Sequence, residues 1–277
     1  MKLFKAHGLG NDYLVLEEGP RMTPGLVRAI CERERGVGGD GVLEPFDAGN
    51  QADYGVRIWN PDGSVAEKSG NGLRIFAHWL VAVRGAPRSF SVWTGACRVE
   101  CEVGAETIGV DMGTASFEPS DVPVDAPEPL IDGELALASG VERVTAVGLG
   151  NPHCVLFRSE PLERVPFRVW GPEIERHPRF PHRTNVQFAR VLDRRRVEIL
   201  IWERGAGETM ASGSSSCAVA AAGVRTGRLD PGRIEVLMPG GTLYVTVADR
   251  GIRLEGPVEA IGRVELDPAW LGARLTA

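Results

Sequence analysis

Short runs of alternating apolar and polar residues dominate the chain. In its first part they are YLVLEE, YGVRIWN, SFSVWTG, CRVECEV and TIGVDMG; in its second part they are RVTAVGLG, HCVLF, NVQFARVL, RVEILIWE, RIEVLM and LYVTVA. These runs are rich in β-branched residues and are bounded by Gly, Pro, Asp or Asn, which predicts strands. Helical patterns are fewer, at about 23–35, 71–84, 167–176 and 215–227. The pattern predicts an α+β fold.

The two halves of the chain repeat one another. GLGN occurs at 8–11 and again at 148–151, and Ile-Trp occurs at 58–59 and 201–202. In each half, a serine followed by a glycine lies ten residues after that tryptophan, at Ser69 and at Ser212, and a predicted helix comes next. Matches in the same order and at nearly the same offset predict an internal duplication.

The duplication predicts two pseudo-symmetric domains. We expect one domain at 1–116, completed by about 260–277, and the other at 117–259. The run GPVEAIGRVEL near the C-terminus is expected to cross back and complete the sheet of the first domain. The segment 117–129 is rich in proline and acidic residues, so it is the predicted linker and hinge.

The two repeated serines lie at positions suited to chemistry. Backbone N–H groups in the first turn of a helix have no partner within the helix, and the helix dipole favours an anion such as a carboxylate there. Side chains at two such helix ends, on opposite faces of one bound amino acid, could invert its stereocentre. One side chain removes the α-proton, and the other returns a proton to the opposite face. The alternative is that Ser69 and Ser212 only cap their helices. The matched pair favours the catalytic interpretation.

Composition excludes several other classes of protein. The formal net charge of −6 argues against a nucleic-acid partner or a membrane surface as partner. Apolar runs are too short for a signal peptide or a membrane span. The five cysteines form no CxxC pair, which is typical of reduced thiols in a cytoplasmic protein. We expect no metal site, since Cys97 and Cys101 have no further histidine or cysteine nearby.

Five segments closely resemble the diaminopimelate epimerase family: KAHGLGNDYLVL, WNPDGSVAEKSGNGLR, GNPHCV, TNVQF and ERGAGETMASGSSSC. They follow the family order from residue 1 to about 260. The resemblance implies two domains, each a strongly curved, mostly antiparallel sheet or barrel around a central helix, and a homodimer. It also implies interconversion of LL- and meso-diaminopimelate in lysine and cell-wall precursor synthesis, with no cofactor. Pyridoxal phosphate would require a lysine that forms a Schiff base with it. Lys68 is the candidate away from the N-terminus, but that role would leave the predicted anion site unused, so we expect no pyridoxal phosphate.

The resemblance also assigns site residues by position. The residues that would bind the substrate, chiefly at its non-reacting end, are Asn11, Asn60, Asn151, Asn185 and Arg204. The backbone amides that would hold the reacting carboxylate are those of Gly70, Asn71, Gly213 and Ser214. His153 and Glu203 would lie beside the reacting centre and support the proton transfers, Glu203 also contacting substrate. Two alternatives remain: Asn60 in NPDG could be a turn residue, and His153 a loop histidine.

The sequence departs from the family at the two acid/base positions. Where the family has cysteines, this chain has Ser69 and Ser212. A thiolate is readily formed at a helix N-terminus, whereas a serine hydroxyl is far less acidic and needs a neighbour, such as His153 or Glu203, to take its proton. Activity could therefore be low, altered or absent.

Several interpretations of the serine pair stay open. The chain could be a natural serine branch of the family, an engineered Cys→Ser variant, or an amino-acid-binding protein without turnover. Lys68 also differs from the commonest family sequence, which favours the natural branch. A carboxylate-using isomerase of the same fold is a further alternative. Its base would be Glu67, Glu203 or Glu208.

Overall fold

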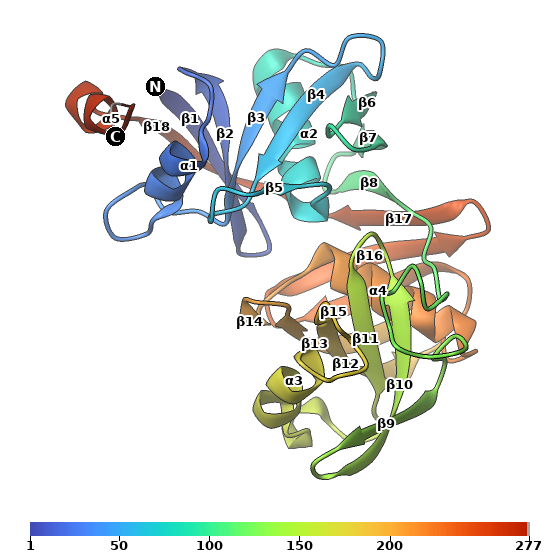
Figure 1. The fold of residues 1–277 in the computed structure, drawn as a ribbon. Coiled ribbons are helices and arrows are strands. Elements are labelled where there is room, and N and C mark those ends of the chain that lie inside the picture. Colours follow the sequence, from blue (N-terminus) through green and yellow to red (C-terminus); the bar gives the residue numbers. More distant parts are fainter. Residues whose placement is uncertain (276–277) are drawn as a thin grey trace. The chain divides into compact units, whose positions relative to one another are not determined.

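The computed structural model describes residues 1–275 and divides the chain into two compact units (Figure 1). Unit 1 consists of Met1–Val110 and the chain from Gly256 onward, and unit 2 consists of Asp111–Glu255. Among the described residues, no helix is long and apolar enough to cross a membrane.

Unit 1 is a mixed sheet with three helices. Its strands are β1 (Lys2–Gly8), β2 (Asn11–Glu18), β3 (Gly41–Phe46), β4 (Tyr54–Trp59), β5 (Val65–Ala66), β6 (Ser89–Trp93), β7 (Arg98–Val103), β8 (Ile108–Gly113) and β18 (Glu259–Glu265), and its helices are α1 (Pro24–Cys31), α2 (Gly70–Arg84) and α5 (Pro268–Leu275). Most neighbours pair antiparallel, but β2 with β3 and β4 with β6 pair parallel. Strand β18 pairs with β1, which confirms that the C-terminal run completes this sheet.

Unit 2 repeats this order. Its strands are β9 (Gly133–Leu137), β10 (Gly140–Gly148), β11 (Pro152–Phe157), β12 (Asn185–Asp193), β13 (Arg196–Glu203), β14 (Gly207–Thr209), β15 (Gly232–Met238), β16 (Gly241–Ala248) and β17 (Gly251–Gly256), and its helices are α3 (Phe167–Glu175), α4 (Gly213–Arg225) and the 3-10 turn Leu162–Arg164. The parallel pairs are again the second with the third strand and the fourth with the sixth, counted from β10. The edge strand β9 pairs with β10 as β18 pairs with β1.

The strand registers show which residues of the two units correspond. Tyr13 on β2 lies opposite Gly41 on β3, and His153 on β11 lies opposite Asn185 on β12. The next residue of β3 or β12 then pairs with the Ile-Trp tryptophan of its own unit. Tyr13 therefore corresponds to His153, and Gly41 corresponds to Asn185. The predicted α+β fold with two pseudo-symmetric halves is confirmed.

Each unit encloses one buried helix. Helix α2 is buried over its first eight residues and packs on β1, β2 and β7, while α4 packs on β10, β11, β12, β15 and β16. A helix that is buried on nearly every side carries few polar side chains. In α4 the residues are also small, and a Cβ added to Gly223 would lie 2.4 Å from Leu229 Cδ1. Close packing against neighbouring residues explains the Ala- and Gly-rich sequence.

Two local expectations are wrong. The predicted helix at 23–35 ends at Cys31, because Glu32 has extended backbone (φ −61°, ψ 126°). The predicted linker 117–129 is a loop packed within unit 2, where Val122 and Val124 join the hydrophobic core and Asp125 N–H donates to Arg179 O. A segment with buried valines is poorly suited to act as a hinge.

Candidate active site

Ser69 caps the central helix of unit 1. Its backbone is extended (φ −141°, ψ 116°), and its Oγ accepts a hydrogen bond from Gly72 N–H at 3.1 Å. The same Oγ lies 3.1 Å from the hydroxyl oxygen of Tyr13. Tyr13 is buried, whereas Ser69 is half-buried. Ser69 therefore caps its helix, and it has a hydroxyl neighbour as well.

Ser212 begins the central helix of unit 2 with the same backbone but a different side-chain environment. Its φ and ψ are −147° and 124°, yet its side chain makes no capping hydrogen bond. Its carbonyl accepts from the N–H and the Oγ of Ser216. The two serines occupy equivalent positions in the fold but are not chemically equivalent. Beyond them lie the first residues of each helix, whose amides were assigned to the carboxylate: Gly70, Asn71, Gly213 and Ser214.

Asn11 and Asn71 are joined in unit 1. Asn71 Nδ2 donates to Asn11 Oδ1 at 2.9 Å, and Arg74 Nη2 donates to Asn71 Oδ1 at 2.9 Å. Arg74 is fully buried. A Cβ on Gly8 would lie 2.9 Å from its Nη2, so the glycine that opens GLGN makes room for this guanidinium.

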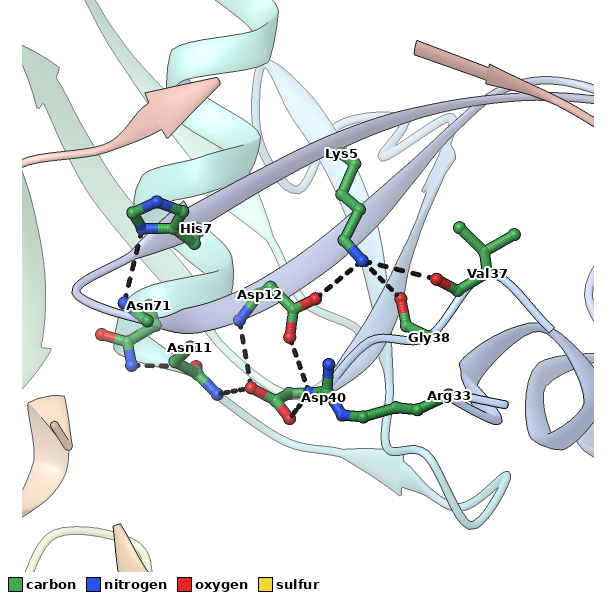
Figure 2. Close-up of polar contacts among 10 residues, drawn as sticks. Lys5, His7, Asn11, Asp12, Arg33, Val37, Gly38, Asp40 and Asn71 are labelled. Atoms are coloured by element: carbon green, nitrogen blue, oxygen red, sulfur yellow. Dashed lines mark hydrogen bonds and ion pairs between the residues drawn. The ribbon is translucent and has the colours of Figure 1, made fainter. Parts of the chain in front are cut away.

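A charged network holds Asn11 from the other side (Figure 2). Asn11 Nδ2 donates to Asp40 Oδ2 at 2.7 Å. Arg33 Nη2 bridges Asp40 Oδ1 at 2.7 Å and Asp12 Oδ1 at 2.8 Å, and Lys5 Nζ lies 3.0 Å from Asp12 Oδ2. Burial alone would raise the pKa of Asp12, but hydrogen bonds from Arg33 and Lys5 outweigh it and lower that pKa. The Asn11 amide is thus fixed before any ligand arrives.

We expect Asp12→Asn to reduce the free energy of unfolding by about 1–3 kcal/mol at pH 7, because it removes charge-assisted hydrogen bonds. Since folding lowers the pKa of Asp12, this stabilisation is present above the ordinary carboxyl pKa of about 4 and is lost as pH falls through the folded-state value. Urea unfolding at pH 7 and pH 3 measures the difference, with the exposed Asp249→Asn as control. A loss that persists undiminished at pH 3 would contradict the assignment.

Asn60 builds a turn between β4 and β5. Its N–H donates to Ser64 O at 2.8 Å and its Nδ2 donates to Ser64 Oγ at 2.9 Å. Gly63 supplies the positive φ of 83° that the turn requires. Asn60 therefore stabilises this turn, and its role in binding substrate stays a prediction.

His153 is fully buried and uses both ring nitrogens. Nδ1 lies 3.0 Å from Gln187 Nε2, and Nε2 lies 2.9 Å from Asn151 Oδ1. Because an amide nitrogen only donates, Nδ1 accepts and Nε2 carries the hydrogen. Burial, and secondarily the positive charge of Arg204, lower the pKa of His153 to about 3.

In this geometry both ring nitrogens of His153 have protein partners, and the expectation that His153 takes the proton of a serine stays a prediction. Its acceptor lone pair is occupied by Gln187, whose Nε2 also donates to Ser215 Oγ at 2.9 Å. His153 fixes the Asn151 amide from a neutral, buried position.

Asn185 and Arg204 also lie together. Asn185 Nδ2 donates to Pro152 O at 2.9 Å, and its Oδ1 accepts from Arg204 N–H at 2.9 Å. The Arg204 side chain is exposed, with Nη1 donating to His182 O at 3.3 Å. Asn185 therefore positions the loop that carries the guanidinium.

The three glutamates considered as alternative bases differ. Glu208 accepts hydrogen bonds from Arg168 Nε at 2.8 Å and Nη2 at 3.2 Å, and Glu67 is exposed. Glu203 ends β13 beside Arg204 and is half-exposed. Within residues 1–275, no group of three or more His, Cys, Asp or Glu side chains could hold a metal ion.

Tyr13 is the site residue that sequence reasoning missed. It lies two residues after the asparagine of the first GLGN, just as His153 lies two residues after that of the second. The family resemblance assigned His153, and the internal repeat could then have identified Tyr13 as its counterpart.

The duplicated fold also occurs in solved structures of other proteins. A solved hydroxyproline epimerase from Agrobacterium vitis matches with a TM-score of 0.70 at 17% identity, over 97% of this chain and 94% of that one. A phenazine biosynthesis protein from Bacillus anthracis matches with a TM-score of 0.69 at 16% identity, over 96% and 99%. At such identities the likeness concerns the fold alone.

Sequence comparison specifies the family. Residues 3–118 and 145–261 match the diaminopimelate epimerase family model. Diaminopimelate epimerase 2 of Nostoc sp. is 43% identical over 256 residues, 90% of this chain and 89% of that protein. The diaminopimelate epimerase of Pelotomaculum thermopropionicum is 39% identical over 280 residues, 94% and 97% of the two chains. The chain belongs to the diaminopimelate epimerase family of isomerases.

Proposed function

We propose that the protein interconverts LL- and meso-diaminopimelate by two-base α-proton transfer, with Ser69 and Ser212 at the base positions. The observation that carries this proposal is the equivalence of the two serines: each begins the buried helix of its unit with extended backbone. The names of the relatives supply the substrate. The serine and the helix start of each unit would form one half-site, and the two half-sites would act on one substrate molecule during turnover. The reaction would need no cofactor and would serve lysine and cell-wall precursor synthesis.

Different groups of the two half-sites would bind different parts of the substrate. Amides at the starts of α2 and α4 would hold the reacting carboxylate, because the first-turn N–H groups and the helix dipole favour an anion. The asparagines fixed by internal hydrogen bonds would bind polar groups of the substrate with little loss of side-chain entropy. The exposed Arg204 guanidinium would form a forked contact with the distal carboxylate. Glu203 would lie beside the reacting centre.

Proton NMR in heavy water tests the proposal. LL-Diaminopimelate is incubated with the protein, and we expect its α-proton signal to decrease while the meso form appears. The Ser69→Ala, Ser212→Ala double variant should bind the amino acid by calorimetry yet exchange no α-proton. A parent protein that binds but never exchanges would be a binding protein, and the proposal would be wrong.

Arg204→Ala should weaken binding of LL-diaminopimelate about tenfold or more, the usual result of losing a charge-assisted hydrogen bond of 1.5–3 kcal/mol. Binding of alanine, which has no distal carboxylate, should change little. Calorimetry with both ligands measures this, and the exposed Arg176→Ala in the same unit is the matched control. Equal losses for both amino acids would remove Arg204 from the distal pocket.

We also propose that the protein works as a homodimer in the cytoplasm. Support comes from the family resemblance alone. Light scattering on the purified protein at several concentrations would show two chains per particle, and a constant single-chain mass would refute the dimer.

A further inference from the structure

Tyr13 and Ser69 form a hydroxyl pair although they lie far apart in the sequence. The two oxygens are 3.1 Å apart, and the residues are separated by 56 positions. Tyr13 is 6% exposed, so its ring is held by the interior of unit 1. Its place depends on Gly41, where an added Cβ would lie 2.6 Å from the ring and 2.4 Å from Trp59 O. The fold thus reserves space for a phenol beside this serine.

The hydrogen bonds of Ser69 allow two states of the pair. A serine hydroxyl has one hydrogen to donate and two lone pairs to accept with, and one lone pair accepts from Gly72 N–H. When Tyr13 donates to Ser69, the serine hydrogen remains for another molecule. When Ser69 donates to Tyr13, a serine lone pair remains instead. The geometry of the pair fits both directions of proton movement, and either oxygen can be the donor.

We propose that Tyr13 is the proton partner of Ser69, an inference that rests on the proposed epimerase function. In the acid direction, Ser69 O–H gives its proton to the α-carbanion, forming the C–H bond, while Tyr13 O–H gives its proton to Ser69 Oγ. The pair is left with one proton and the negative charge on the phenolate. In the base direction, Ser69 Oγ takes the α-proton, its own proton moves to the phenolate, and the electron pair of the C–H bond stays on carbon.

The chemical advantage is the place where the charge rests. A phenol has an ordinary pKa of about 10, and a serine hydroxyl is far less acidic. When Tyr13 acts through Ser69, the negative charge rests on the phenolate and no serine alkoxide forms. The helix dipole alone would not stabilise such an alkoxide sufficiently. Tyr13 is a positioning residue in this scheme, since Ser69 contacts the substrate.

Unit 2 has no such pair. The residue equivalent to Tyr13 is His153, whose ring nitrogens contact Asn151 and Gln187. Ser212 has the backbone of Ser69 without a capping hydrogen bond. The hydroxyl pair is therefore a property of the first half-site.

The experiment is a double-mutant cycle on α-proton exchange in heavy water. Tyr13→Phe removes one oxygen, and we expect exchange of LL-diaminopimelate to fall about a hundredfold, within the usual range for loss of acid–base assistance. Its calorimetric Kd and its urea unfolding midpoint should stay close to those of the parent. In a Ser69→Cys background, Tyr13→Phe should change exchange less than about threefold, because a thiol ionises without help. Tyr54→Phe, the same chemical change elsewhere in unit 1, is the control.

The outcomes separate this inference from the proposed function. If Tyr13→Phe lowers exchange equally in the serine and cysteine backgrounds, Tyr13 has a structural role and the pair is wrong. If the parent binds without exchanging while Ser69→Cys exchanges, the site is right and the hydroxyl pair does not work. If neither exchanges, even with Ser212 also changed to cysteine, the proposed function itself fails.

Discussion

Replacing both Ser69 and Ser212 by cysteine should raise the rate of diaminopimelate epimerisation at least a hundredfold over the parent protein. A thiol has an ordinary pKa near 8.5, and a helix N-terminus lowers it further. The thiolate is then ready to remove an α-proton, and a well-placed base contributes about 10²–10⁴ to a rate. Both positions begin buried helices with extended backbone, so a sulfur would occupy the place of each oxygen.

Proton NMR in heavy water compares the parent, the two single changes and the double change. A single cysteine should wash out one α-proton but invert poorly, so the double variant should exceed the sum of the singles. Ser89→Cys and Ser159→Cys place exposed thiols elsewhere in each unit and should have no effect. A parent as fast as the double variant would show that hydroxyls suffice. A double variant that binds without exchanging would show that these side chains do not reach the α-carbon.

His153 should make the protein markedly less stable below neutral pH. Folding lowers its pKa from 6.5 to about 3, so between those values the unfolded chain binds a proton that the folded chain does not. Stability therefore falls as pH falls below 6.5, by about 1.4 kcal/mol per pH unit. Between pH 7 and pH 5 we expect this group to remove about 2 kcal/mol from the free energy of unfolding.

Urea unfolding at half-unit steps of pH measures this slope. His153→Gln should be less stable than the parent at pH 7, because it disturbs the contacts with Asn151 and Gln187, but its stability should vary less with pH. His182→Gln, at an exposed position, should keep the slope of the parent. Parallel curves for the parent and His153→Gln would mean that folding does not lower the pKa of His153.

Much of the fold could be predicted because it rests on local patterns. Alternation identified most strands, and the helical pattern after each Ser-Gly pair identified α2 and α4. Strand β3 was missed because Gly41 and Pro45 interrupt its pattern, yet Pro45 lies within the strand. The segment 117–129 misled because its proline-rich composition resembles a linker, whereas the burial of Val122 and Val124 depends on partners elsewhere in unit 2.

The site was less predictable, since its chemistry depends on residues distant in sequence. Ser69 and Ser212 look alike in their local sequences, and only the fold shows that one has a phenol beside it. The neutral state of His153 likewise follows from complete burial and from Gln187, 34 residues away. Positions that belong to one repeat could be found from the sequence; the contacts that distinguish the two copies could not.

The equivalent positions Gly41 and Asn185 have different roles in the two halves of the chain. The side chain of Asn185 holds the Arg204 loop, and at the equivalent place in the first copy Tyr13 leaves no room for a side chain. An asparagine at 41 would be harmful unless Tyr13 also changed, so the effects of substitutions at these two neighbouring positions depend on one another. A gene made from two first halves would lack the arginine loop, and one made from two second halves would lack the phenol. Neither half of the chain could therefore replace the other.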